Sequence, residues 1–402
     1  MVKRYGLWVH LGGALTARVG DEMSGPALLL AGLALTGTAA EASALLAGIA
    51  AAAALGGPAL GPFLDRVDRP GRLLAGALAG YAAGLVLVAG ALGRLPFAAI
   101  LAVAVCTGLA GPALSAGWTA QLPRAAGDGE GLDRANALDA MTFCAAGLAG
   151  PVLAGGAAEL LGAPAAVVLS AVLVALALPA AWVLPARSTG ARHPRPASAA
   201  TVPASVVRAV AGRPALARAT LSSVVCAVAQ GIVTVCVPLL GARVLGGSGR
   251  GAMLLSCTAL TALAATAVLA RFPRVLSPGT VMWASALVLA GSSALALCPH
   301  PAALVTAFLV AGVGEGPQLA ALFAIRHREA PEGLRGRVFT TGASLKITGF
   351  ALGAAVGGPL ASWSLAGALV AAAGVSVLAA VVFLAVPYTA RACFRGRPPA
   401  GR

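Results

Sequence analysis

Apolar stretches of about 20 residues recur along the whole chain, separated by short polar breaks. A helix of that length is long enough to cross the hydrocarbon core of a bilayer. The composition agrees, because a chain of 402 residues with 59% hydrophobic and only 10% charged residues has too little polar surface to be a water-soluble protein. We therefore expect a polytopic membrane protein.

The stretches are rich in Ala, Leu, Val and Gly and do not alternate polar with apolar positions. A transmembrane β-barrel would show that alternation, so the predicted fold class is an all-α membrane protein with two six-helix bundles. The twelve predicted spans are residues 8–34, 43–63, 71–92, 96–120, 136–160, 163–184, 218–241, 251–272, 279–298, 302–325, 337–362 and 364–387.

One long polar segment, rich in Pro, Arg, Ser and Ala, divides the spans six and six. We predict an N-terminal bundle over 1–184, a cytoplasmic linker over 185–217, a C-terminal bundle over 218–387 and a basic cytoplasmic tail over 388–402. The halves also repeat weakly, as expected for two parallel repeats. The matching residues are Arg66 and Arg69 with Arg271 and Arg274, and Arg134, Gly150 and Gly155 with Arg337, Gly353 and Gly358.

The net charge of +15 follows the predicted topology. If the N-terminus is cytoplasmic, most Lys and Arg residues lie on the cytoplasmic side, and only Arg94, Arg243 and Arg250 lie in outside loops. Both termini are therefore predicted to be cytoplasmic, in a cell membrane, with the basic surface facing anionic lipid headgroups rather than nucleic acid. The preference for Arg, Ala and Gly indicates a bacterial coding sequence.

Several kinds of site are not predicted. The cysteines form no CxxC pair and the histidines have no ligand spacing, so we expect neither a metal site nor a cofactor. The chain also lacks the GxxxxGK[ST] phosphate loop of an ATP-driven pump. We expect a monomer that is not an enzyme.

A charged, glycine-containing run lies between the second and third spans, from Gly61 to Arg72. Its Gly61, Asp65, Arg66, Arg69 and Arg72 resemble the signature found at this place in the major facilitator superfamily. The twelve spans, the six-plus-six division and the basic linker resemble that family along essentially the whole chain. The resemblance implies that the run controls a cytoplasmic gate, while a generic membrane-surface loop is the alternative.

A second resemblance lies in the fifth span. Its Gly147, Gly150, Pro151, Gly155 and Gly156 resemble the motif of exporters in this superfamily, although Ala146 and Ala154 replace expected glycines. Proline removes a helical hydrogen bond and small residues permit close helix crossing. The motif favours export over uptake. In contrast, the fourth span lacks the arginine that many proton-coupled members carry there, which puts proton transfer by that route in doubt.

Ionisable residues within the spans are further candidates, because a charge at bilayer depth is costly and rarely faces lipid. Arg18 is spaced so that it can meet Asp21 or Glu22 one turn along the first span. Glu315, within a Gly-rich segment of the tenth span, and Lys346 of the eleventh lie at similar depths. Our hypothesis is that Glu315 binds a proton or a cationic substrate and that Lys346 keeps it ionised; a structural salt bridge is the alternative for both clusters.

Four polar residues are candidates either to line the central cavity or to join helices by hydrogen bonds: Trp118, Gln121, Gln230 and Gln318. We predict a secondary transporter that exports hydrophobic or cationic small molecules in exchange for protons by alternating access. An uptake carrier for a small metabolite is the alternative within the class. A polytopic membrane enzyme and a sensor that does not transport are alternatives from other classes.

Overall fold

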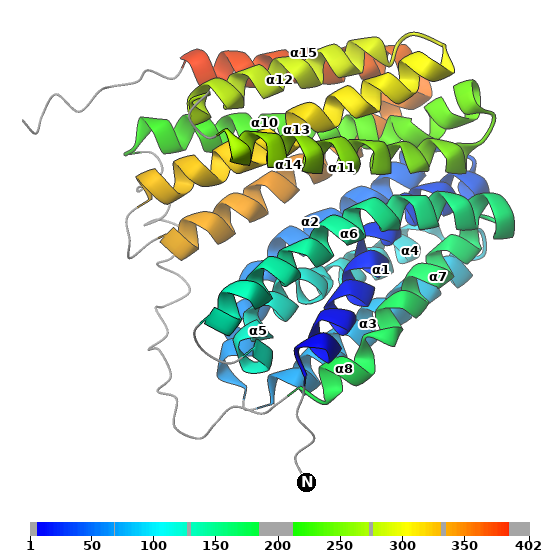
Figure 1. Ribbon diagram of the computed structural model, residues 1–402. Helices are drawn as coiled ribbons and strands as arrows, with labels where there is room; N and C mark the ends of the chain where they lie inside the picture. Colours follow the sequence, from blue (N-terminus) through cyan, green and yellow to red (C-terminus); the bar gives the residue numbers. More distant parts are fainter. Residues whose placement is uncertain are drawn as a thin grey trace, which may run out of the picture.

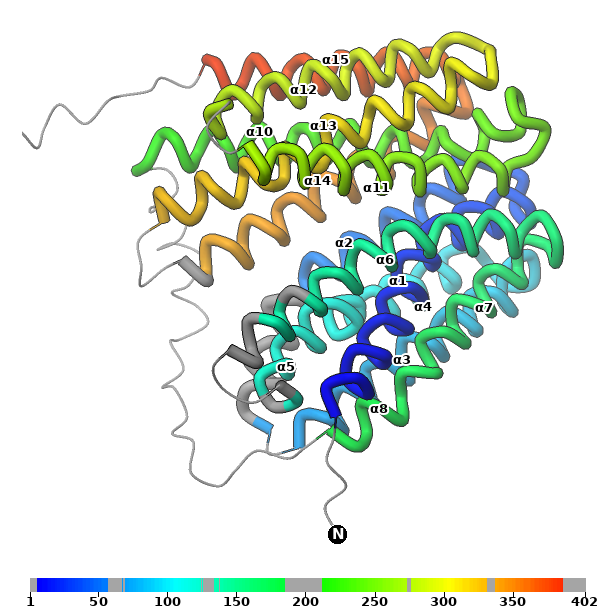
Figure 2. Tube along the Cα trace, viewed as in Figure 1, coloured from blue at the N-terminus to red at the C-terminus, as the bar shows by residue number. Residues whose placement is uncertain are grey.

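The computed structural model describes residues 6–67, 69–126, 130–184, 212–272, 276–330 and 335–385. These residues form a helical protein with two bundles, one from each half of the chain (Figure 1). Figure 2 shows the blue-to-green first half lying beside the green-to-red second half. The predicted linker lies mostly outside the described residues, and the helix that follows it begins at Pro214, a few residues before the predicted boundary at 217.

The helices of the first bundle match the predicted spans closely. They are α1 (Leu7–Thr36), α2 (Ala39–Arg66), α3 (Pro70–Ala91), α4 (Phe97–Gly108), η1 (Ala113–Gly117), α5 (Trp118–Ala126), α6 (Glu130–Leu161), α7 (Ala163–Leu176) and α8 (Leu178–Trp182).

Two predicted spans of this bundle are interrupted. The fourth consists of α4, the π-helical η1 and α5, and the break falls where Gly108, Gly111 and Pro112 weaken regular helical bonding. The sixth consists of α7 and α8, and Pro179 lies in the first turn of α8.

The second bundle contains α10 (Pro214–Leu240), η3 (Gly241–Leu245), α11 (Ser248–Arg271), α12 (Pro278–Leu295), α13 (Pro301–Glu329), α14 (Arg335–Trp363) and α15 (Leu365–Ala385). Ten helical segments of the described chain are long and apolar enough to cross a membrane. The spans of α1 and α14 fall outside those ten, and they are the ones that carry Arg18, Asp21, Glu22 and Lys346.

We call the end of the molecule where α1 begins the N-terminal face and the opposite end the far face. The bundles contact each other mainly through α2 against α14 and α6 against α11. On the half nearer the far face, an apolar cluster that includes Leu29, Leu46, Val235 and Ala354 joins them. Toward the N-terminal face the two bundles lie apart (Figure 1).

Candidate functional site

A cavity of about 860 Å³ lies between the two bundles. Residues of both bundles line it, and the lining reaches Ala120 of α5 and Thr340 of α14 toward the N-terminal face. Most of the wall is apolar and built from small residues. Three carboxylates are part of it: Asp21 and Glu22 from α1, and Glu315 from α13. None of the described lining residues is Lys, Arg or His.

Asp21 is held by a tyrosine from a neighbouring helix. The hydroxyl of Tyr81 in α3 donates to Asp21 Oδ1 at 3.0 Å and lies 2.9 Å from Ser24 Oγ. Ser24 Oγ in turn donates to the Asp21 carbonyl at 2.7 Å. Tyr81 is only 2% exposed and lies in the core of the first bundle. Tyr81 could not be singled out from the sequence, because a tyrosine in an apolar span carries no signal of its partner.

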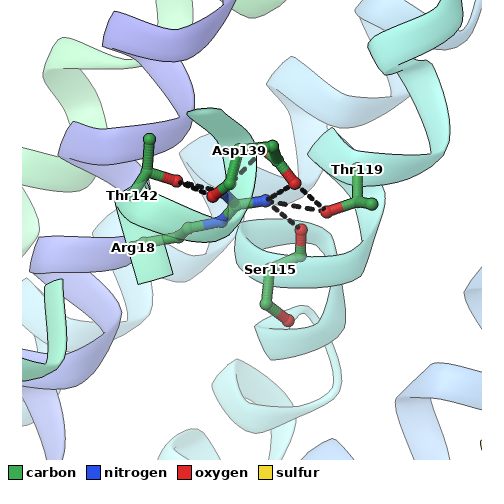
Figure 3. A network of polar contacts seen from close by, with 5 residues as sticks. All are labelled: Arg18, Ser115, Thr119, Asp139 and Thr142. Carbon is green, nitrogen blue, oxygen red and sulfur yellow. Dashed lines mark hydrogen bonds and ion pairs between the residues drawn. The ribbon is translucent and has the colours of Figure 1, made fainter. Parts of the chain in front are cut away.

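Arg18 does not meet Asp21 or Glu22, so the predicted pairing within the first span is wrong. Its guanidinium binds Asp139 of α6, with Nη1 at 2.7 Å from Oδ1 and Nη2 at 3.3 Å from Oδ2 (Figure 3). Helical side chains lean toward the N-terminus of their helix, which carries Arg18 away from residues three and four positions further on.

The network around this pair joins three spans. Arg18 also donates to Thr142 and to Thr119 Oγ1, the latter at 2.9 Å, and Thr119 Oγ1 donates to Asp139 Oδ2 at 2.7 Å. Arg18 Nη2 reaches the Ser115 carbonyl in η1 at 3.2 Å, so the irregular fourth span supplies an acceptor (Figure 3). The ring centroid of Phe143 lies 3.6 Å from the guanidinium carbon. Arg18 and Asp139 are thus buried, and both Nη atoms and both carboxylate oxygens have partners, while Arg18 Nε has none among the described residues. The network indicates a structural clamp that joins the helices of the first bundle.

Glu315 and Lys346 lie near each other but form no direct ion pair. Each contributes to the electrostatic environment of the other. Gln230 of α10, which also lines the cavity, lies close to Glu315. Gln318 lies behind the wall, where its Nε2 is 3.1 Å from Cys226 Sγ. Of the other polar candidates, Trp118 is fully buried in the core of the first bundle and Gln121 is buried away from the cavity.

The glycines predicted as an export motif lie where helices approach closely. Gly147 and Pro151 line the cavity. A Cβ on Gly150 would be 2.7 Å from Glu22 Cβ, so Gly150 brings α6 against α1. A Cβ on Gly155 would clash with the carbonyl of Gly249 in α11, whereas one on Gly156 would be 3.7 Å from Met253.

The side chains of Asp65 and Arg66 lie outside the described residues, so the role of Gly61, Asp65 and Arg66 at a gate stays a prediction. Arg69 is exposed ahead of α3, and the Arg72 guanidinium lies 5.4 Å from the Trp182 ring centroid.

Arg326 comes directly after the span predicted at 302–325, yet it is 1% exposed near the end of α13. A Cβ on Gly342 of α14 would clash with its guanidinium, so the absence of a side chain at that position makes room for the cation. The ring centroid of Phe339 lies 5.9 Å from it. An arginine at the end of a span usually reaches the membrane surface, and only the tertiary packing shows that Arg326 is buried.

Comparison with known proteins agrees with this architecture. The model of the Major Facilitator Superfamily matches residues 11–341. A structure of a mutant of the nucleoside transporter NupG superposes with a TM-score of 0.78 at 14% identity, covering 94% of this chain and 99% of that one.

A structure of the peptide transporter POT in complex with sulfate gives a TM-score of 0.74 at 15% identity, covering 96% of this chain and 94% of that one. No curated protein sequence matches the chain. At these identities the structures show a shared fold, and the family match extends over most of the chain. The chain belongs to the major facilitator superfamily and is a secondary transporter.

Proposed function

We propose that this transporter exports cationic, partly apolar small molecules in exchange for protons. The observation that carries the proposal is the set of carboxylates around the cavity, Asp21 and Glu22 from one bundle and Glu315 from the other, in a wall whose described residues include no cation. Such a wall attracts cations, and its apolar surface favours substrates with hydrophobic parts. The glycines of α6 support the same direction of transport.

Asp21 and Glu315 have different surroundings. Asp21 accepts a hydrogen bond from the neutral hydroxyl of Tyr81 and lies next to the carboxylate of Glu22 in the sequence. Arg18 of the same helix forms its ion pair with Asp139 instead. Glu315 has Gln230 and Lys346 in its surroundings. Carboxylates in this position can exchange a proton for a cation as access alternates, since protonation and cation binding satisfy the same charge.

The orientation is part of the proposal. With the N-terminal face in the cytoplasm, the basic residues follow the positive-inside rule and the cavity opens inward. Both termini lie in the cytoplasm in this orientation. The proposed location is the cell membrane of a bacterium. In this state a cytoplasmic substrate has access to Asp21, Glu22 and Glu315.

Uptake of a small metabolite is the second candidate. It is favoured by the solved structures of similar fold, which are described as nucleoside and peptide transporters. Neutral polar side chains line the cavity as well, but its three carboxylates and the absence of Lys, Arg and His among the described lining residues fit a cation better than a neutral nucleoside.

Flux into proteoliposomes tests the proposal. A panel of lipophilic cations, neutral drugs and nucleosides is assayed with an imposed pH gradient of either direction and with none. Cations should accumulate in the compartment from which protons flow out, and collapse of the gradient should stop accumulation. Flux of all cations that is indifferent to the gradient contradicts proton coupling, and nucleoside flux down a proton gradient supports uptake instead.

A further inference from the structure

A carboxylate of the first bundle caps a helix of the second bundle at the far face. Glu159, near the end of α6, accepts a hydrogen bond from the backbone N–H of Gly249 at 2.8 Å and a longer one from Arg250 at 3.3 Å. These N–H groups belong to the first turn of α11, where a helix has no acceptors of its own. The residue ahead of α11 is Gly247, which has no side chain to supply a cap. Glu159 therefore takes the place of the missing N-cap from across the interface.

Glycines around the start of α11 allow this contact. The run from Gly246 to Gly251 contains four glycines, and Gly246 has a φ of 74°, which favours glycine. A Cβ on Gly249 would be 2.5 Å from the Gly155 carbonyl oxygen and 2.7 Å from Glu159 Cγ. A Cβ on Gly247 would clash with the Glu159 carboxylate. These glycines let the α11 backbone approach α6 closely enough for the carboxylate to reach it.

The contact lies where the bundles are closed rather than where they are apart. Alternating access requires the far face to open, and α6 and α11 belong to opposite bundles. Opening at that face separates the two helices and leaves the first N–H groups of α11 without their carboxylate. The interaction thus stabilises the state open to the N-terminal face and is lost in the other state.

We propose that Glu159 is a positioning residue that holds the far-face gate closed by capping α11 in trans. It sets the balance between the two access states and does not touch the substrate. The proposal depends on alternating access but not on which substrate or ion is carried.

The balance is measured by the distance between spin labels on Leu35→Cys and the native Cys298, with the remaining cysteines replaced by alanine. Both positions are exposed near the far face, one in each bundle. The protein is studied in nanodiscs without substrate, so that failure of the export proposal does not affect the result. Thermal unfolding of each variant confirms that the fold is retained.

Glu159→Ala should raise the ratio of the long-distance to the short-distance population about tenfold, as expected for the loss of a charge-assisted hydrogen-bond pair. Glu159→Gln, which keeps an acceptor, should give a smaller rise. Glu41→Ala is the matched control, because Glu41 lies near the same face in the first turn of α2 and should leave the distances unchanged. Distances in both Glu159 variants equal to those of the wild type and the control would overturn the proposal. If Glu159→Ala does not fold, the comparison of Glu159→Gln with Glu41→Ala decides it.

Discussion

Arg18 Nη1 lies 2.7 Å from Asp139 Oδ1, and this pair joins α1 to α6 across 121 positions of sequence. Because Arg18 pairs with Asp139, it does not neutralise Asp21 and Glu22, which lie three and four positions further along α1. Arg18 and Asp139 stabilise the first bundle, whereas Asp21 and Glu22 remain at the cavity without a cation among the described lining residues.

Breaking the Arg18–Asp139 pair should destabilise the protein. Asp139→Asn leaves a buried guanidinium without its counter-ion, and we expect a loss of about 3 kcal/mol in the free energy of unfolding. The double variant Arg18→Met with Asp139→Leu should lose less, because it leaves no unpaired charge. Thermal and denaturant unfolding in detergent measures both.

The control for this experiment is the ion pair of Arg328 and Glu329, whose nitrogen–oxygen distance is 3.1 Å. The Arg328 side chain is 60% exposed, so Arg328→Gln should change stability by less than about 1 kcal/mol. Equal losses for the buried and the exposed pair would show that Arg18 and Asp139 do not clamp the bundle.

Two adjacent glycines of α6 should respond differently to one added methyl group. Gly155→Ala places a Cβ against the Gly249 carbonyl and should force α6 and α11 apart at the far face, whereas Gly156→Ala meets only Met253 Cε at 3.7 Å. Thiol labelling of Thr234→Cys, in the cavity wall, from the far side should therefore increase with Gly155→Ala and not with Gly156→Ala. The same labelling rate in both variants would contradict the close contact.

Tyr81→Phe tests the role of the hydroxyl that holds Asp21. The ring remains in the core, so the variant should fold, but Asp21 loses its donor at 3.0 Å. We expect the affinity for a cationic substrate to fall about threefold to tenfold, as for one hydrogen bond. Equilibrium binding measures the change.

Thr234→Val is the control, because the Thr234 hydroxyl lines the cavity but bonds to the Gln230 carbonyl of its own helix. A loss of affinity of similar size in Thr234→Val would show that the Tyr81 hydroxyl has no specific role in cation binding.

The spans, their number and their division into two halves could be predicted because the length of an apolar stretch determines whether it can cross a bilayer. The breaks at Gly108 to Pro112 and at Pro179 follow from local chemistry and were within reach of the sequence. Asp139 was also within reach, since it is an ionisable residue inside the span predicted at 136–160.

The pairing of Arg18 with Asp139 could not be predicted from one chain, because it depends on the packing of α1 against α6 and on the direction of the Arg18 side chain. The same holds for Tyr81 with Asp21 and for Glu159 with the start of α11. In each case the partners come from different helices, and spacing along one helix gives no information about them.

We propose that Glu315 binds the coupling proton or the cationic substrate, and flux with Glu315→Gln tests this role. The measurement is the uptake of a fluorescent lipophilic cation by proteoliposomes under an imposed pH gradient, with the thermal unfolding temperature of the same sample. We predict that Glu315→Gln abolishes gradient-driven uptake and leaves the unfolding temperature close to that of the wild type. Full gradient-driven uptake by Glu315→Gln, or a large loss of stability that accounts for lost flux, would rule out this role of Glu315 and favour a structural role for Glu315 and Lys346.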